Sequence, residues 1–83
     1  MHIFDRITGT ITGVTSSTSI WIRQRYNGKP DRIQVYNKGD RDSHTILFYN
    51  NLDDARKEMS GIALALKNRE PVYPSQFNVS PDE

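Results

Sequence analysis

The sequence predicts a small α+β domain in which a four-stranded antiparallel meander is followed by one helix packed on its apolar face. Two observations support this fold. Short segments of β-branched and aromatic residues succeed one another up to Tyr49, and from Leu52 apolar residues recur at steps of three and four. We expect one domain over residues 1–70. Residues 71–83 would form a tail that pairs as a fifth strand, reaches a partner chain or is partly disordered. A small, partly closed barrel ending in a helix is the alternative.

The size and composition of the chain limit the interactions that can stabilise this fold. A chain of 83 residues buries a thin core, and the absence of cysteine excludes disulfides and thiolate metal sites. We therefore expect a homo-oligomer. Because the amino terminus lacks a secretion signal and no segment has the length to cross a bilayer, we also expect a soluble, cytoplasmic protein without a membrane partner.

The first strand is expected within residues 6–15, RITGTITGVT. Its Ile-Thr-Gly repeat alternates apolar and polar positions, which is typical of a twisted strand that bends at glycine. The polar segment TSST that follows predicts a turn.

The second and third strands are expected over Ser19–Tyr26 and Asp31–Asn37, joined at Asn27-Gly28, a favoured hairpin turn. Pro30 discourages strand pairing close to that turn.

Two registers are open for this hairpin. A two-residue turn would place Ile22 opposite Ile33 and Ile20 opposite Val35, whereas a four-residue loop would place Ile22 opposite Val35. Both registers bring the same side chains to the outer face.

The fourth strand is expected at HTILFY, His44–Tyr49, after a polar loop. Apolar side chains would lie on both faces of this strand, so neither face would be fully solvated.

An amphipathic helix is expected over Leu52–Lys67, with Asn51 as its N-cap. Gly61 costs about 1 kcal/mol of helix propensity relative to alanine, so a close approach to the sheet would explain it. Charged residues 56–58 fall outside the apolar stripe. That stripe consists of Leu52, Ala55, Met59, Ile62, Ala63 and Leu66.

The hairpin would have one basic and aromatic face. Residues 19–41 contain six basic and two acidic residues, a balance of +4 in a chain whose net charge is +1. In one register Arg23 faces Arg32 directly, and these like charges repel each other unless an anion or an acid lies between them. Strand alternation directs the following side chains away from the apolar face: Trp21, Arg23, Arg25, Arg32, Gln34 and Tyr36.

This face favours a non-catalytic module that binds single-stranded nucleic acid, because guanidinium groups neutralise phosphates and flat rings stack on unpaired bases. Tyr49 is a further candidate for stacking. The alternative is a protein-interaction module, an inhibitor or an assembly subunit, that grips an acidic protein through the same face. The predicted binding residues are Trp21, Arg23, Arg25, Lys29, Arg32, Gln34 and Tyr36.

The order of elements and the basic hairpin loosely resemble small strand-rich proteins of the transcriptional-coactivator type, which bind single-stranded DNA as dimers. No diagnostic motif accompanies this resemblance, and all that it implies is a mode of binding.

The sequence gives little support for catalysis. Asp40, Asp42 and His44 alternate before the fourth strand, but such residues are common in polar turns and we expect no metal site. Asp53 and Asp54 complement the dipole of the helix without any role as a base. Because no phosphate-binding loop and no nucleophile motif is present, we expect neither an enzyme nor a cofactor.

Overall fold

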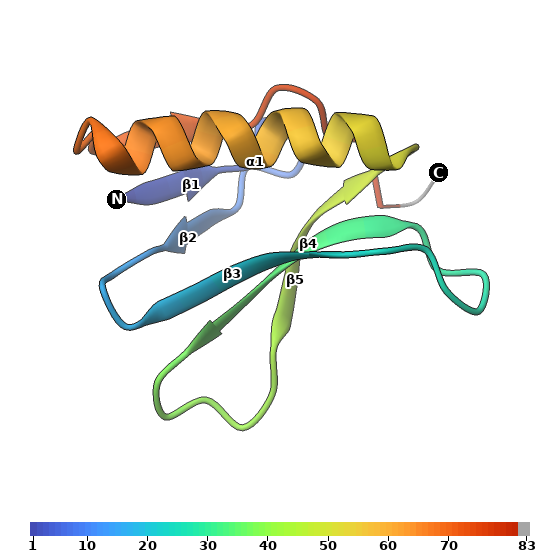
Figure 1. The fold of residues 1–83 in the computed structure, drawn as a ribbon, viewed down its shortest axis with the longest axis horizontal. Coiled ribbons are helices and arrows are strands. Elements are labelled where there is room, and N and C mark those ends of the chain that lie inside the picture. Colours follow the sequence, from blue (N-terminus) through green and yellow to red (C-terminus); the bar gives the residue numbers. More distant parts are fainter. Residues whose placement is uncertain (82–83) are drawn as a thin grey trace.

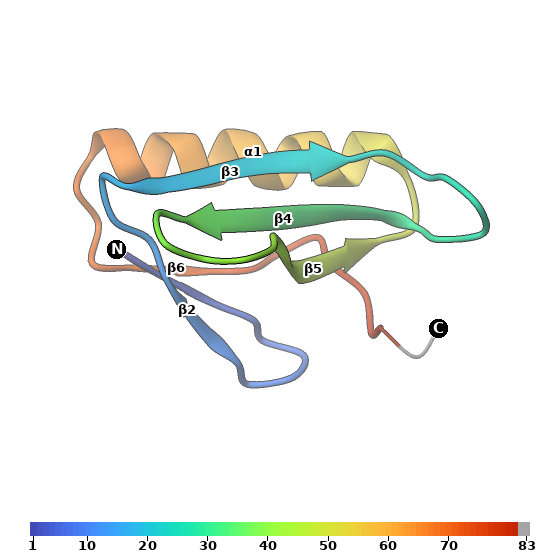
Figure 2. The same cartoon turned by 90° about the horizontal axis from the view of Figure 1, so that it is seen from below.

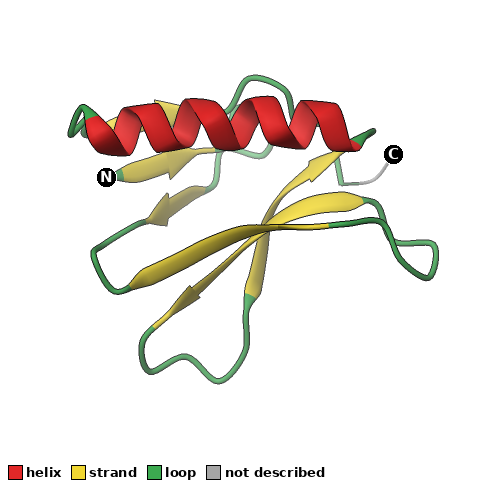
Figure 3. Ribbon diagram, in the orientation of Figure 1, coloured by secondary structure: helices red, strands yellow, loops and turns green. Residues whose placement is uncertain are grey.

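The computed structural model of the chain describes residues 1–81 and contains six strands and one helix within that range (Figures 1 and 3). The α+β class is therefore confirmed. In chain order the elements are β1 (His2–Phe4), β2 (Ile11–Gly13), β3 (Thr18–Arg23), β4 (Asp31–Asn37), β5 (His44–Tyr49), α1 (Leu52–Lys67) and β6 (Val72–Pro74).

The strands form two separate three-stranded sheets, in the orders β2-β1-β6 and β3-β4-β5. Figure 2 shows α1 running along the β3-β4-β5 sheet, and residues of both sheets and of the helix share one core. The predicted four-stranded meander is thus a three-stranded meander, and the sheets do not close into the alternative barrel. The remaining strands are only three residues long, and β1 pairs with β6 across most of the chain length, which a local pattern does not reveal.

The strand predicted within residues 6–15 is present but shorter than expected, because only Ile11–Gly13 forms a strand there. The Asp5 carboxylate accepts hydrogen bonds from the backbone N–H of Ile7 and the hydroxyl of Thr8, both at 2.9 Å. Gly9 adopts a φ of +80°, which favours glycine. These interactions fold residues 5–10 into a turn, and only the end of the segment becomes β2.

Asp5 also ties this turn to the C-terminal segment, because its carboxylate accepts from the Asn78 side chain at 2.9 Å. Burial raises the pKa of the Asp5 carboxyl, but the hydrogen bonds from Ile7, Thr8 and Asn78 outweigh burial and bring the pKa below its ordinary value. The ionised form is therefore the one that the turn stabilises.

The two-residue hairpin register is confirmed. Ile22 lies opposite Ile33, and Ile20 opposite Val35. The turn residues Asn27 and Gly28 have φ values of 51° and 76°, as a type I′ turn requires. Strand β3 ends at Arg23, three residues before the predicted end. Beyond it, the Arg25 N–H bonds to the Asp31 carboxylate at 2.8 Å instead of a strand carbonyl.

Strand β5 has the predicted bounds and contains an irregularity that explains its two apolar faces. Leu47 pairs with Ile33, but the next pair along is Thr45 with Gln34, so Ile46 is an extra residue in β5. Ile46 packs against the core together with Leu47, although adjacent strand residues normally point to opposite faces.

The helix has the predicted bounds, and its N-cap is confirmed because the Asn51 side chain accepts from the Asp54 N–H at 2.8 Å. Its buried side differs from the predicted stripe. The buried residues are Ala55, Glu58, Ile62 and Ala65, whereas Ala63 and Leu66 are exposed. The prediction that Glu58 lies outside the buried stripe is wrong: its relative exposure is 0%.

The expected close approach at Gly61 is confirmed, and its partner is the side chain of Tyr73 in β6. A Cβ atom at Gly61 would lie 2.5 Å from the Tyr73 hydroxyl oxygen and 3.1 Å from two ring carbons. The Tyr73 hydroxyl also donates to Glu58 at 2.6 Å, which holds the ring in place. A side chain at position 61 would therefore displace a ring that is already hydrogen-bonded.

Gly61→Ala is expected to lower the free energy of unfolding by about 2 kcal/mol, the cost of overpacking a filled core. In an unobstructed helix the same change stabilises by about 1 kcal/mol, so the sign of the effect is diagnostic. Urea denaturation measures it, with the exposed neighbour Ser60→Ala as the control. A more stable Gly61→Ala protein would show that Tyr73 does not occupy this position.

Part of the predicted tail is structured within this chain. Strand β6 pairs in parallel with β1, and the Arg6 N–H donates to the Ser75 hydroxyl at 3.1 Å. The disorder expected at the end of the tail concerns residues 82–83, which lie outside the described residues. Among residues 1–81, no helix has both the length and the apolar character needed to cross a bilayer.

Candidate functional site

The candidate site is the face of the β3-β4-β5 sheet that points away from the core, here called the hairpin face. The strand register arranges it in rows: Arg23, Arg32 and Phe48 form one row, and Trp21, Gln34 and Thr45 form the next. Ser19 and Tyr36 complete the face. The alternate positions of the same strands, Ile20, Ile22 and Ile33 among them, pack on the core shared with α1. The rows therefore place Trp21 and Arg23 together on the outer side.

Arg23 and Arg32 lie directly opposite each other in the register. Arg32 is only 8% exposed, and its guanidinium donates to the Pro30 carbonyl at 2.9 Å. Among residues 1–81, neither arginine has a carboxylate within ion-pair distance. The neighbouring acid, Asp31, accepts from the backbone of Arg25. Two arginines at paired strand positions, without an acidic partner among the described residues, favour binding of an anion.

Trp21 and Gln34 form the centre of the hairpin face. Trp21 is half-buried, so part of the indole remains accessible. The Gln34 side chain is 9% exposed and donates to the Thr45 hydroxyl at 3.0 Å. Its amide oxygen is buried and has no hydrogen-bond partner among the described residues. An unpaired buried acceptor costs free energy of folding.

The other three predicted contact residues differ in position. Tyr36 is exposed at the edge of the hairpin face. Arg25 lies beyond the end of β3, and its guanidinium donates to the Asn50 carbonyl at 2.7 Å. Lys29 is exposed in the turn, where it pairs with Tyr26. The structure thus brings Trp21, Arg23, Arg32, Gln34 and Tyr36 onto one face, while Arg25 and Lys29 extend it toward the turn.

Phe48 is the ring that sequence reasoning missed on this face, and the prediction that Tyr49 is available for stacking is wrong. Phe48 lies opposite Arg32, whereas Tyr49 is fully buried in the core. Because side chains alternate along a strand, either Phe48 or Tyr49 lies on the hairpin face and the other points to the core. The long loop before β5 does not fix how β5 pairs with β4, so the sequence cannot decide between them. Only the pairing of β4 with β5 decides it.

Glu58 is at the centre of a second polar cluster, inside the core. Its carboxylate accepts from the hydroxyls of Tyr49 and Tyr73, at 3.1 and 2.6 Å, and from the N–H groups of Gln76 and Phe77, the shortest of these at 3.0 Å. Burial, followed by the nearby Glu58 carboxylate, raises the pKa of both tyrosines well above the ordinary value. Both hydroxyls therefore stay protonated and donate. Tyr49 ties β5 to the helix, while Tyr73 and the two N–H groups fasten the C-terminal segment to it.

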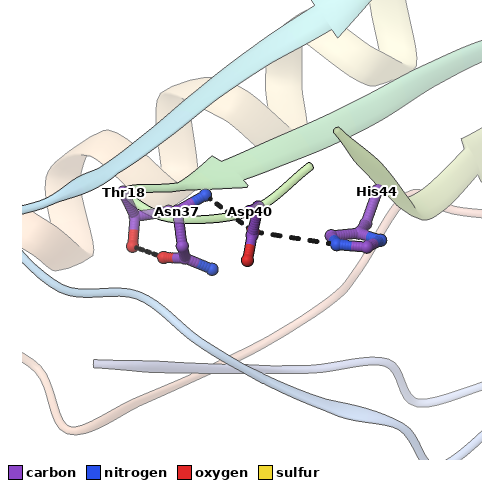
Figure 4. A network of polar contacts seen from close by, with 4 residues as sticks. All are labelled: Thr18, Asn37, Asp40 and His44. Carbon is purple, nitrogen blue, oxygen red and sulfur yellow. Dashed lines mark hydrogen bonds and ion pairs between the residues drawn. The ribbon is translucent and has the colours of Figure 1, made fainter. Parts of the chain in front are cut away.

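Asp40 and His44 belong to a chain of polar contacts at the β4-β5 loop (Figure 4). Asp40 accepts from the Asn37 N–H at 3.0 Å and lies 3.7 Å from the His44 ring nitrogen. The Asn37 side chain in turn accepts from the Thr18 hydroxyl. Among residues 1–81, no three metal-binding side chains of the His, Cys, Asp and Glu types come together. These contacts among the described residues hold the β4-β5 loop in its conformation.

Comparisons with protein-family models, curated proteins and solved structures give no match to this chain.

Proposed function

We propose that the chain is a non-catalytic module that binds single-stranded nucleic acid through the hairpin face. The observation that carries this proposal is the opposed pair Arg23 and Arg32, which has no carboxylate partner among residues 1–81. A phosphate between two guanidinium groups would accept hydrogen bonds from both and relieve their repulsion. Arg25 and Lys29 would add phosphate contacts toward the turn.

The rings beside this pair support a single strand over a duplex. Trp21 lies in the row next to the two arginines, and Tyr36 is exposed two residues beyond Gln34. Unpaired bases stack on such rings whatever their identity, whereas the bases of a duplex are already stacked on one another.

Titrating the protein with a short oligothymidine should quench the fluorescence of Trp21, the single tryptophan of the chain. With three phosphates neutralised, one between Arg23 and Arg32 and one each at Arg25 and Lys29, affinity should fall about twentyfold between about 50 and about 200 mM salt. A duplex of the same length is the matched control. It should bind more weakly and quench less, because its bases are not free to stack on the indole.

Three outcomes would contradict the proposal. Absence of binding at low salt removes it, and equal quenching by the duplex removes the stacking contribution. Binding of polyglutamate without any binding of oligonucleotides would instead assign the hairpin face to an acidic protein partner.

The cytoplasmic location stays a prediction, and so does the homo-oligomer. Support for self-association comes from the outer face of the β2-β1-β6 sheet, where Ile11 and Val72 are 63% and 51% exposed beside Phe4. A second copy would cover these apolar side chains and add to a core that is small for a stable fold.

A further inference from the structure

A cavity of about 280 Å³ lies between the hairpin turn and the C-terminal segment. Arg25, Pro30, Phe48, Asn50, Val79 and Pro81 contribute to its lining. Two interactions hold its walls together: the Val79 N–H donates to the Phe48 carbonyl at 2.8 Å, and the Arg25 guanidinium donates to the Asn50 carbonyl at 2.7 Å. The walls thus come from three separate parts of the chain joined by hydrogen bonds.

The cavity is continuous with the hairpin face through two residues. Phe48 lines the cavity and also forms the row with Arg23 and Arg32. Pro30 lines it too, and its carbonyl accepts from the Arg32 guanidinium at 2.9 Å. A strand whose phosphate lies between Arg23 and Arg32 is therefore next to two residues that line the cavity.

The lining combines the two kinds of group that a nucleotide needs. Phe48, Val79 and Pro30 offer apolar surface to a flat ring, while the Arg25 guanidinium supplies positive charge and Asn50 a polar backbone and side chain. The volume is close to the lower end of small-molecule sites, about 300 Å³, which suits one base and excludes several.

We propose that this cavity holds one nucleobase of the bound strand, turned out of the stack, with the adjoining phosphate on Arg25. This inference rests on the proposed function and adds a subsite to it. The hairpin face would hold the strand by charge and stacking, and the cavity would hold a single base by enclosure. Binding would then depend on the shape of the base as well as on the backbone.

Val79→Phe tests the subsite because a larger side chain fills the cavity without removing an arginine. We expect oligothymidine affinity to fall at least about fivefold, the loss of one stacked base. The salt dependence should stay the same, since no phosphate contact is lost. Val72→Phe makes the same change on the β2-β1-β6 sheet and should bind as the parent protein does. Thermal unfolding establishes that both variants fold.

Equal affinity of Val79→Phe and Val72→Phe, while the parent protein binds oligothymidine, would overturn the subsite and leave the proposed function standing.

A second measurement uses the unaltered protein and deoxyadenosine monophosphate. The backbone amide signals of Gly28, Asn50 and Val79 should shift in NMR spectra at millimolar nucleotide. Shifts confined to the hairpin face would also overturn the subsite. Failure to bind any oligonucleotide contradicts the proposed function itself. In that case the mononucleotide titration still tests whether the cavity binds a nucleotide.

Discussion

Glu58→Gln is expected to lower the free energy of unfolding by about 3 kcal/mol, a larger loss of stability than Gly61→Ala should cause. The carboxylate accepts from two tyrosine hydroxyls and two backbone N–H groups in a site with no exposure. Glutamine has nearly the same shape, but its NH₂ group is a donor and would face other donors. Urea denaturation of the parent and variant proteins measures the difference.

Glu70→Gln is the control for this substitution, because Glu70 is exposed after the helix and its loss should change stability by less than about 0.5 kcal/mol. Hydrogen exchange adds a local test. In Glu58→Gln the amides of Gln76 and Phe77, which donate to Glu58, should exchange faster than in the parent protein. A Glu58→Gln protein as stable as the control would show that the carboxylate does not hold this cluster together.

Replacing both Arg23 and Arg32 with glutamine is expected to weaken oligothymidine binding about thirtyfold at low salt. Arg23 and Arg32 lie opposite each other in the strand register, and neither has a carboxylate partner among residues 1–81. Glutamine keeps much of the side-chain length and removes the charge. Fluorescence titration through Trp21 measures the affinity of each protein.

A matched variant removes two charges elsewhere. Arg56→Gln with Lys67→Gln alters exposed positions on α1, which packs on the opposite side of the β3-β4-β5 sheet. This double substitution should lower the affinity for oligothymidine by less than about threefold. Because Arg32 is largely buried, Arg23→Gln alone serves as a variant whose folding is not at risk. Equal losses in the hairpin and helix variants would mean that binding follows net charge and not the hairpin face.

The parts of the fold with strong local patterns were predicted well. Strands β4 and β5 and helix α1 have the bounds that the sequence indicates. The sequence left two registers open for the Asn27-Gly28 hairpin, and the structure has the one that places Arg23 opposite Arg32. Both registers put the same side chains on the outer face. Most of the hairpin face could therefore be assigned from residues close together in the chain.

The parts that depend on distant contacts could not be predicted. Strand β1 pairs with β6 across most of the chain, and three residues are too few to show a pattern. Glu58 resembles a surface residue in the sequence because its hydroxyl partners come from β5 and β6. The choice between Phe48 and Tyr49 likewise needed the register of β5.

The salt dependence of binding tests the central claim most directly, because it counts the phosphates that the arginines neutralise. The slope of log affinity against log salt should decrease in magnitude by about 0.7 from the parent protein to the Arg23→Gln, Arg32→Gln variant, which is the loss of the one phosphate held between the two arginines of a single-strand complex. Equal slopes for the two proteins would contradict the claim that Arg23 and Arg32 bind the nucleic-acid backbone.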